Sequence, residues 1–167
     1  MLTDLVQIKQ LGEKKRGENL KLRMHLKTHD YGDRRLRRIA EGVEEAIDCR
    51  ACANCCRVAT ARVREGDVGK LAKHLRITPG RVLAEFTVES ADEGAVLRRT
   101  AGGCIFLSGN ECTVYDARPR SCVNFPHVVR GNGSIVSRMW EMVDRAVYCP
   151  IVYNTLEAFK DAAGFRR

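Results

Sequence analysis

Eight cysteines give this sequence of 167 residues its clearest chemical signal. Four of them lie within eight positions, in the run C-R-A-C-A-N-C-C that begins at Cys49 and ends at Cys56. The full set of candidate metal ligands is Cys49, Cys52, Cys55, Cys56, Cys104, Cys112, Cys122 and Cys149. Thiols at this density hold a metal or form a framework of disulfide bonds. The choice between these two chemistries decides most of what the sequence says about function.

The N-terminal residues favour the metal. A secretory signal peptide has an apolar core, but residues 1–20 are interrupted by acidic and basic residues, including the run Lys14-Lys15-Arg16. No apolar stretch approaches the roughly 18 residues that a membrane-spanning helix needs. We therefore expect a cytoplasmic protein with no membrane contact. In that reducing compartment clustered cysteines serve as metal ligands more often than they form disulfides.

The spacing of the cysteines indicates which metals to expect. Thiolates are soft ligands, which select zinc or iron over magnesium or calcium. Intervals of two residues separate Cys49, Cys52 and Cys55, as in zinc knuckles and in ferredoxin-type runs. The side chains of the adjacent Cys55 and Cys56 diverge, so they rarely serve one ion. Eight thiols fit two zinc ions or two iron–sulfur clusters, or one centre with spare thiols, and the sequence leaves the partition open.

Other side chains near the later cysteines could assist. His127 is a candidate ligand or hydrogen-bond donor to a sulfur. Arg118 and Arg120 lie close to Cys122 in sequence, where cations lower a thiol pKa and offset thiolate charge, although plain surface charge is the alternative. Cys149-Pro150 is similar to the Cys-Pro ending of ferredoxin runs, yet favours a helix that begins at the proline.

Helices are the first elements that must position these residues. Apolar residues from Leu36 to Ile47 fall at 3.6-residue spacing, which predicts a helix over residues 33–48 that ends at the cysteine run. A second helix is expected within residues 63–75, and a third from Thr78-Pro79, where threonine caps and proline takes the first position. Residues 20–26 alternate apolar and basic side chains in a helix-friendly composition, so their structure stays open.

Two short β-hairpins are expected further along. Residues 104–107 and 112–115 flank a polar turn, an arrangement that would bring Cys104 and Cys112 together at the open end of a hairpin. A second hairpin is expected around Gly131-Asn132-Gly133, between residues 128–129 and 135–136. Beyond it we expect Trp140 and Met142 in the core, and a last helix from Pro150 to Gly164. The predicted fold class is α+β, mostly helical, a small metal-stapled single domain with one or two short hairpins.

The net charge of +8 is concentrated near the N-terminus. Residues 1–38 hold 11 Lys or Arg against 5 Asp or Glu. We expect residues 1–35 to be a basic N-terminal extension and residues 36–167 to be the cysteine-cluster metal-binding domain. The extension is a candidate contact for nucleic acid or an acidic protein, but the absence of interleaved aromatic residues favours a solvated helix face. His25 and His29, four residues apart, are either a metal pair or two exposed side chains.

Four ordered motifs carry a resemblance to a known family: C-x-x-C-x-x-C-C at Cys49–Cys56, G-C-I-F-L at Gly103–Leu107, C-T-V-Y-D-A-R-P-R-S-C at Cys112–Cys122, and N-F-P at Asn124–Pro126. Over about 100 residues the chain resembles the YkgJ-type cysteine-cluster family, whose members are described as zinc- or iron-chelating. The resemblance implies bound zinc or iron. Some relatives are labelled iron–sulfur oxidoreductases, and flagellin lysine N-methylases carry a similar cluster. Asn54 and Ile151-Val152 stand where many members have glycine, which weakens the transfer of any one activity.

Three functions follow from these patterns. The first is a metal-binding protein that chelates zinc or iron, as ions or as an iron–sulfur cluster. The second is an iron–sulfur oxidoreductase or an enzyme of protein methylation, although the sequence shows no Gly-rich cofactor loop, no H-E-x-x-H and no nucleophile–base pair. The third is a zinc-stapled nucleic-acid-binding protein. The motifs favour the first function and leave open whether the protein is an enzyme.

Overall fold

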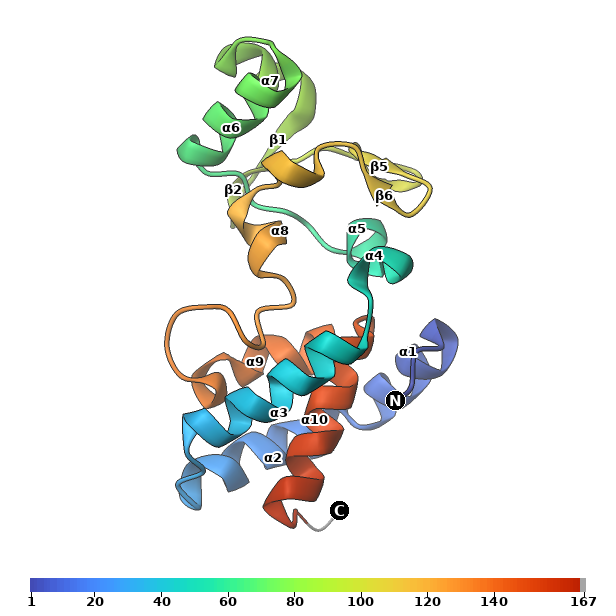
Figure 1. The fold of residues 1–167 in the computed structure, drawn as a ribbon, viewed down its shortest axis with the longest axis vertical. Coiled ribbons are helices and arrows are strands. Elements are labelled where there is room, and N and C mark those ends of the chain that lie inside the picture. Colours follow the sequence, from blue (N-terminus) through green and yellow to red (C-terminus); the bar gives the residue numbers. More distant parts are fainter. Residues whose placement is uncertain (166–167) are drawn as a thin grey trace. The chain divides into compact units, whose positions relative to one another are not determined.

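The computed structural model describes residues 1–165, which form two compact units (Figure 1). The helical unit comprises Met1–Asp48 together with the chain from Pro126 onward, and the cysteine unit comprises Cys49–Phe125. The predicted α+β class is confirmed, because helices dominate and the strands form three two-stranded antiparallel sheets in the described residues. The boundary predicted between residues 35 and 36 stays a prediction.

The helical unit contains five helices in the described residues: α1 (Leu5–Lys14), α2 (Arg16–Thr28), α3 (Asp33–Ala46), α9 (Ile135–Arg145) and α10 (Pro150–Ala163). The helix predicted over residues 33–48 is α3, which ends at Ala46, and the last helix begins at Pro150 as expected and has Gly164 as its C-cap. Residues 20–26 are helical, because Leu22 and Leu26, four residues apart, are both buried against the neighbouring helices. None of the helices in residues 1–165 combines the length and the apolar character that a membrane crossing requires.

Buried ion pairs join the N-terminal helices to α10. Lys160 is only 1% exposed, and its Nζ lies 2.5 Å from Glu18 Oε1 and 2.7 Å from Glu157 Oε1. Lys15 Nζ lies 2.5 Å from the other oxygen of Glu157. Burying a lone ammonium group is costly, so these carboxylates are the partners that allow Lys160 to be inside. Much of the positive charge of α1 and α2 therefore lies on helices that pack into the unit.

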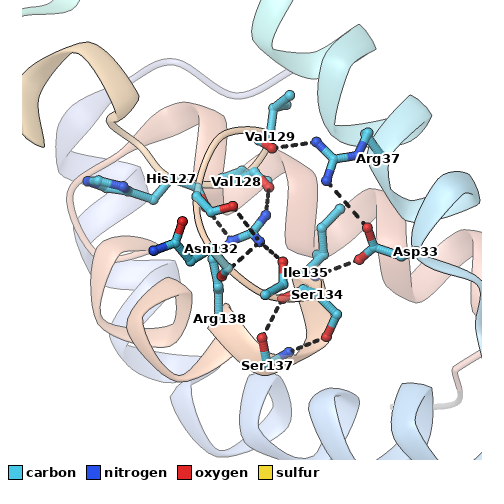
Figure 2. A network of polar contacts seen from close by, with 12 residues as sticks. Asp33, Arg37, His127, Val128, Val129, Asn132, Ser134, Ile135, Ser137 and Arg138 are labelled. Atoms are coloured by element: carbon cyan, nitrogen blue, oxygen red, sulfur yellow. Dashed lines mark hydrogen bonds and ion pairs between the residues drawn. The ribbon is translucent and has the colours of Figure 1, made fainter. Parts of the chain in front are cut away.

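The hairpin predicted around Gly131–Gly133 is wrong. Residues 127–134 form a loop, and Ile135 begins α9 after a cap in which the Ser134 hydroxyl accepts the Ser137 N–H at 3.1 Å. The Arg138 guanidinium organises this loop by donating to five main-chain carbonyl oxygens (Figure 2). Those carbonyls belong to His127, Val128, Gly131, Asn132 and Gly133. Because these carbonyl oxygens accept hydrogen bonds from Arg138, they are not used in the inter-strand hydrogen bonds that a hairpin would need.

Trp140 is also not where its pattern indicates. Its side chain is 56% exposed, and the guanidinium of Arg23 lies over the indole, 4.2 Å from the ring centroid. Met142, by contrast, is buried as expected. On α9 the buried residues are Ile135, Met139, Met142 and Val143, which fall on one face at helical spacing and leave Trp140 outside it.

The cysteine unit begins with two short helical turns, α4 (Cys49–Cys52) and α5 (Asn54–Val58), followed by α6 (Glu65–Leu75) and α7 (Pro79–Phe86). As predicted, the Thr78 side chain caps α7 by accepting the Arg81 N–H. The strands are β1 (Thr87–Ser90), β2 (Gly94–Leu97), β3 (Arg99–Thr100), β4 (Gly103–Cys104), β5 (Leu107–Ser108) and β6 (Glu111–Cys112), and the 3-10 turn η1 (Tyr115–Ala117) and helix α8 (Arg120–Asn124) complete the unit. Its core centres on Leu71, Val82 and the stacked rings of Phe86 and Phe106.

Candidate metal centre

The cysteine run folds as two helical turns joined at Ala53. This residue has φ 47°, in the left-handed region, and its N–H donates to the Cys49 carbonyl oxygen at 2.9 Å. The left-handed residue lets the chain reverse between α4 and α5, so that thiols three positions apart are presented around a tight bend. Asn54, the position noted for its missing glycine, lies one residue later and is helical.

The turn between β5 and β6 is fastened to the cysteine run. The Arg57 guanidinium donates to the carbonyl oxygens of Cys52 and Gly109, at 3.3 Å and 2.8 Å, and to Asn110 Oδ1 at 2.5 Å. The Asn110 amide in turn donates to the Ala51 carbonyl oxygen at 2.9 Å. These contacts, between residues more than 50 positions apart in sequence, hold the β5–β6 turn, which precedes Cys112, against the run Cys49–Cys56.

Gly103 allows β4 to lie directly on the backbone of α5. Its φ is +123°, and a Cβ atom at this position would lie 2.6 Å from the Cys56 carbonyl oxygen and 2.9 Å from the Arg57 Cα. Only glycine fits so close an approach in that conformation. Since Cys104 follows Gly103, this contact sets the proximity of Cys104 to Cys56.

Cys104 and Cys112 occupy matching positions in two neighbouring hairpins. Cys104 on β4 pairs with Arg99, and Cys112 on β6 pairs with Leu107. The predicted hairpin is therefore present but shorter, and Cys104 belongs to the hairpin before it. Burial raises the pKa of both thiols, and a backbone N–H two residues further on, from Phe106 or Val114, donates to the sulfur and opposes that rise. Such N–H donors favour the thiolate form.

A buried carboxylate positions the helix that carries Cys122. Asp67 is buried, and one of its oxygens accepts the Arg64 N–H at 3.0 Å, which caps α6. The other oxygen accepts the Arg120 N–H at 2.9 Å, at the first residue of α8. Both bonds are charge-assisted, so one carboxylate joins the starts of two helices. Burial raises the pKa of Cys122 to about 12, and the neighbouring thiols contribute to the rise.

The four thiols of Cys56, Cys104, Cys112 and Cys122 are electrostatic neighbours. Cys56 influences the pKa of each of the other three, Cys112 influences that of Cys104, and both Cys104 and Cys112 influence that of Cys122. They come from α5, β4, β6 and α8, four segments that span most of the cysteine unit. These four of the eight predicted ligands are therefore close enough to interact electrostatically, and Cys55 joins them through its hydrogen bond to Cys56.

Cys56 differs from the other three in its charge environment. The pKa of Cys56 is lowered to about 6, mainly by a hydrogen bond from Cys55 and also by the guanidinium groups of Arg57, Arg118 and Arg99, while burial opposes these effects. The sequence placed Arg118 near Cys122, and the structure shows its influence on the pKa of Cys56 and Cys112 instead. Arg57, Arg99, Asp67 and Gly103 were not sequence candidates, because their contacts join residues far apart in the sequence.

Four further candidates belong to the helical unit: Cys149, His127, His25 and His29. Cys149 lies in the helical unit, where it is buried and forms the N-cap of α10, and His127 begins the loop around Arg138. The rings of His25 and His29 lie 4.0 Å apart, with His29 Nδ1 2.9 Å from the His25 carbonyl oxygen. Among residues 1–165 no cysteine forms a disulfide, and no three His, Cys, Asp or Glu side chains have an arrangement that would hold a metal ion. Ligation by the eight cysteines stays a prediction.

Comparison with known proteins assigns a domain to most of the chain. A family model named CxxCxxCC, described as "Putative zinc- or iron-chelating domain", matches residues 48–150. The matched region contains all eight cysteines and covers the whole cysteine unit. No curated protein and no solved structure matches the chain.

Proposed function

Because the chain belongs to the CxxCxxCC family, we propose that it is a metal-binding protein that holds zinc or iron through its cysteine thiolates. The observation that carries this proposal is the family match over residues 48–150, and the electrostatic influence of Cys56, Cys104, Cys112 and Cys122 on one another's thiols supports it. Thiolate sulfur is the ligand that both metals share in structural sites. The donors present therefore fit either metal.

Burial raises the pKa of Cys104, Cys112 and Cys122, and several neighbouring groups oppose that rise or lower the pKa of Cys56. Four thiolates close together repel one another unless a cation is present. Here backbone N–H groups donate to the sulfurs of Cys104 and Cys112, and three arginines surround Cys56. A purely apolar role for these cysteines would need neither kind of support. The arrangement is suited to a thiolate-rich metal site whose formal charge is negative.

A bound metal would also contribute to the stability of the cysteine unit. Four of its six strands are only two residues long, so their ladders hold little of the fold together. Metal binding at sites of this kind supplies on the order of 10 kcal/mol, which becomes folding free energy when the apo chain lacks the preformed site. Such an ion would link α5, β4, β6 and α8 from within.

Metal analysis of anaerobically purified full-length protein tests the proposal. We expect zinc or iron bound through sulfur, and loss of part of that metal in Cys122→Ser. Val123→Ser is the matched control, because Val123 adjoins Cys122 and its side chain is exposed. A brown protein with iron and acid-labile sulfide indicates a cluster, whereas a colourless protein with zinc indicates zinc ions. A wild-type protein that takes up neither metal under reducing conditions would remove the proposal.

A further inference from the structure

We propose that helices α2 and α9 present a surface that binds single-stranded nucleic acid, with Trp140 as the platform on which a base stacks. The two helices pack side by side in the helical unit (Figure 1). The Trp140 surface consists of Trp140 on α9 and of Leu20, Arg23, Met24 and Lys27 on α2. This binding is a further function and does not depend on the metal binding proposed above.

One side of α2 is both apolar and basic. Leu20, Arg23, Met24 and Lys27 fall at positions i, i+3, i+4 and i+7, which places them on the same side of the helix. The buried residues of α2 lie on the other side, whereas Leu20 and Met24 are exposed. With Trp140, which is also exposed, they form a cluster of apolar side chains beside two cations. Clustered apolar surface of this kind marks a place where a partner binds.

Trp140 is held in a fixed position by Arg23. The guanidinium lies 4.2 Å from the centroid of the indole, and its Nε donates to the Val136 carbonyl oxygen at 3.2 Å, one turn before Trp140 on α9. One face of the indole is therefore covered by a cation, and the exposed part of the side chain is its other face and edge. An aromatic ring with an open face is the platform on which an unpaired base stacks.

The fold supplies an aromatic residue that the local sequence lacks. No Phe, Tyr or Trp lies between the basic residues of α2 in the sequence, which favoured a solvated helix face. The packing of α9 on α2 brings Trp140 to those basic residues from more than 100 positions away. The basic helix and its stacking platform therefore come from two distant parts of the chain.

The cations of α2 at this surface have no carboxylate partner within the chain. Among residues 1–165, none of Lys21, Arg23 and Lys27 forms an ion pair. Over the same residues, the terminal nitrogens of the Arg23 guanidinium donate to no other group, because its hydrogen bond to Val136 uses Nε. Lysine and arginine side chains in this state can bind the phosphates of a strand whose bases stack on the indole.

The pattern of charge also distinguishes this partner from others. A second copy of the chain would bring the same cations face to face, and like charges across an interface are unfavourable. The carboxylates that follow Trp140 on α9, Glu141 and Asp144, are paired with Arg145 and Arg16, so they do little to repel a polyanion. An acidic protein segment would satisfy the cations, but its carboxylates offer no planar face to the indole.

The fluorescence of unaltered full-length protein tests the proposal, because Trp140 is the one tryptophan in the sequence. We expect a single strand of about 12 uridines or thymidines to quench this fluorescence, with weaker binding as salt rises. The tighter of the two strands assigns the sugar, and either order supports the proposal. A duplex of the same length has its base faces covered and should not quench. Equal quenching by the duplex, or a response to polyglutamate and none to either single strand, overturns the proposal; the second result indicates an acidic protein partner.

Substitutions locate the interaction, measured as fluorescence anisotropy of a labelled single strand. Trp140→Ala should raise the dissociation constant about tenfold, and Trp140→Phe, which keeps a ring, should raise it by about threefold or less. Lys27→Ala should reduce the slope of log K against log salt by about 0.7. Lys70→Ala is the matched control and should bind like the wild type, because Lys70 is an exposed lysine of the cysteine unit. Binding that is unchanged in Trp140→Ala overturns the proposal.

Discussion

The substitution Gly103→Ala tests how closely β4 must lie on α5. Two costs arise at this position. Backbone at φ +123° is strained for any residue with a side chain, at about 1–3 kcal/mol. The added methyl group would also lie 2.6 Å from the Cys56 carbonyl oxygen, and overpacking against rigid backbone costs about 1–3 kcal/mol. We expect a total loss of about 4 kcal/mol in the free energy of unfolding.

Two other glycines separate these costs. An alanine at Gly102 would meet nothing closer than the Thr100 hydroxyl at 3.8 Å, so Gly102→Ala should change stability by less than about 0.5 kcal/mol. Gly109 has φ +61° but open space around it, so Gly109→Ala carries the backbone strain alone, about 1 kcal/mol. The order of destabilisation should be Gly103, then Gly109, then Gly102.

Urea unfolding of the three alanine variants, followed by circular dichroism with and without metal, provides the measurement. Metal retention against a chelator should fall in Gly103→Ala and stay near the wild-type value in Gly102→Ala, because only the former moves Cys104 away from Cys56. If Gly103→Ala were no less stable than Gly109→Ala, the contact between β4 and α5 would not have the closeness described here.

Three other predictions follow from single side chains. Asp67→Ala should lower the free energy of unfolding by about 3 kcal/mol, because two charge-assisted bonds are lost, whereas the exposed Glu65→Ala should cost under about 0.5 kcal/mol in the same urea assay; equal effects would contradict the role of the carboxylate. In the apo protein at pH 7, iodoacetamide should label Cys56, whose pKa is about 6, well before Cys122, whose pKa is about 12, and the advantage should shrink below pH 6; mass spectrometry showing the reverse order would refute this. Arg76→Gly should raise the melting temperature by relieving a left-handed residue, worth about 1 kcal/mol, and a lower melting temperature would refute it.

Local signals in the sequence were sufficient for several helices. Thr78-Pro79 specifies the start of α7 because the cap and the proline act within one turn. The apolar spacing from Leu36 onward specifies α3, because burial of one face determines where that helix can lie. The end of α10 at Gly164 needs only a residue that accepts φ 59°. In each case the information lies in the element itself or in the residues that flank it.

The failures have an equally physical cause. The residues around Gly131 have the composition of a hairpin turn, but Arg138 draws their carbonyls to itself from the next helix. Helical spacing also could not place Trp140, because the pattern allowed a stripe that includes it, whereas the buried face of α9 passes through its neighbours. In the first case a side chain of the following helix decides the loop structure, and in the second the packing of α9 decides which face is buried.

The candidate site divides in the same way. The number of cysteines is plain from the sequence, and the two-residue intervals indicated a bend in the chain that presents successive thiols on one side. The side chains that bring the segments together could not be predicted, because Arg57 meets Asn110 and Asp67 meets Arg120 across more than 50 residues. The doublet Gly102-Gly103 was the one visible hint, although nothing in the sequence distinguishes the glycine that needs its freedom from the one that does not.

The hydrogen bonds from Arg138 to the loop of residues 127–134 determine which of its residues can be substituted. Every bond from this guanidinium to the loop ends on a main-chain oxygen, which all twenty amino acids supply alike. Most side chains of the loop are therefore open to replacement without loss of its shape, while Gly133, with φ +75° and a neighbouring hydroxyl 2.8 Å from where its Cβ would lie, is not. Because Arg138 holds the loop through its main chain, the exposed side chains of the loop can vary in sequence while its backbone keeps the same conformation.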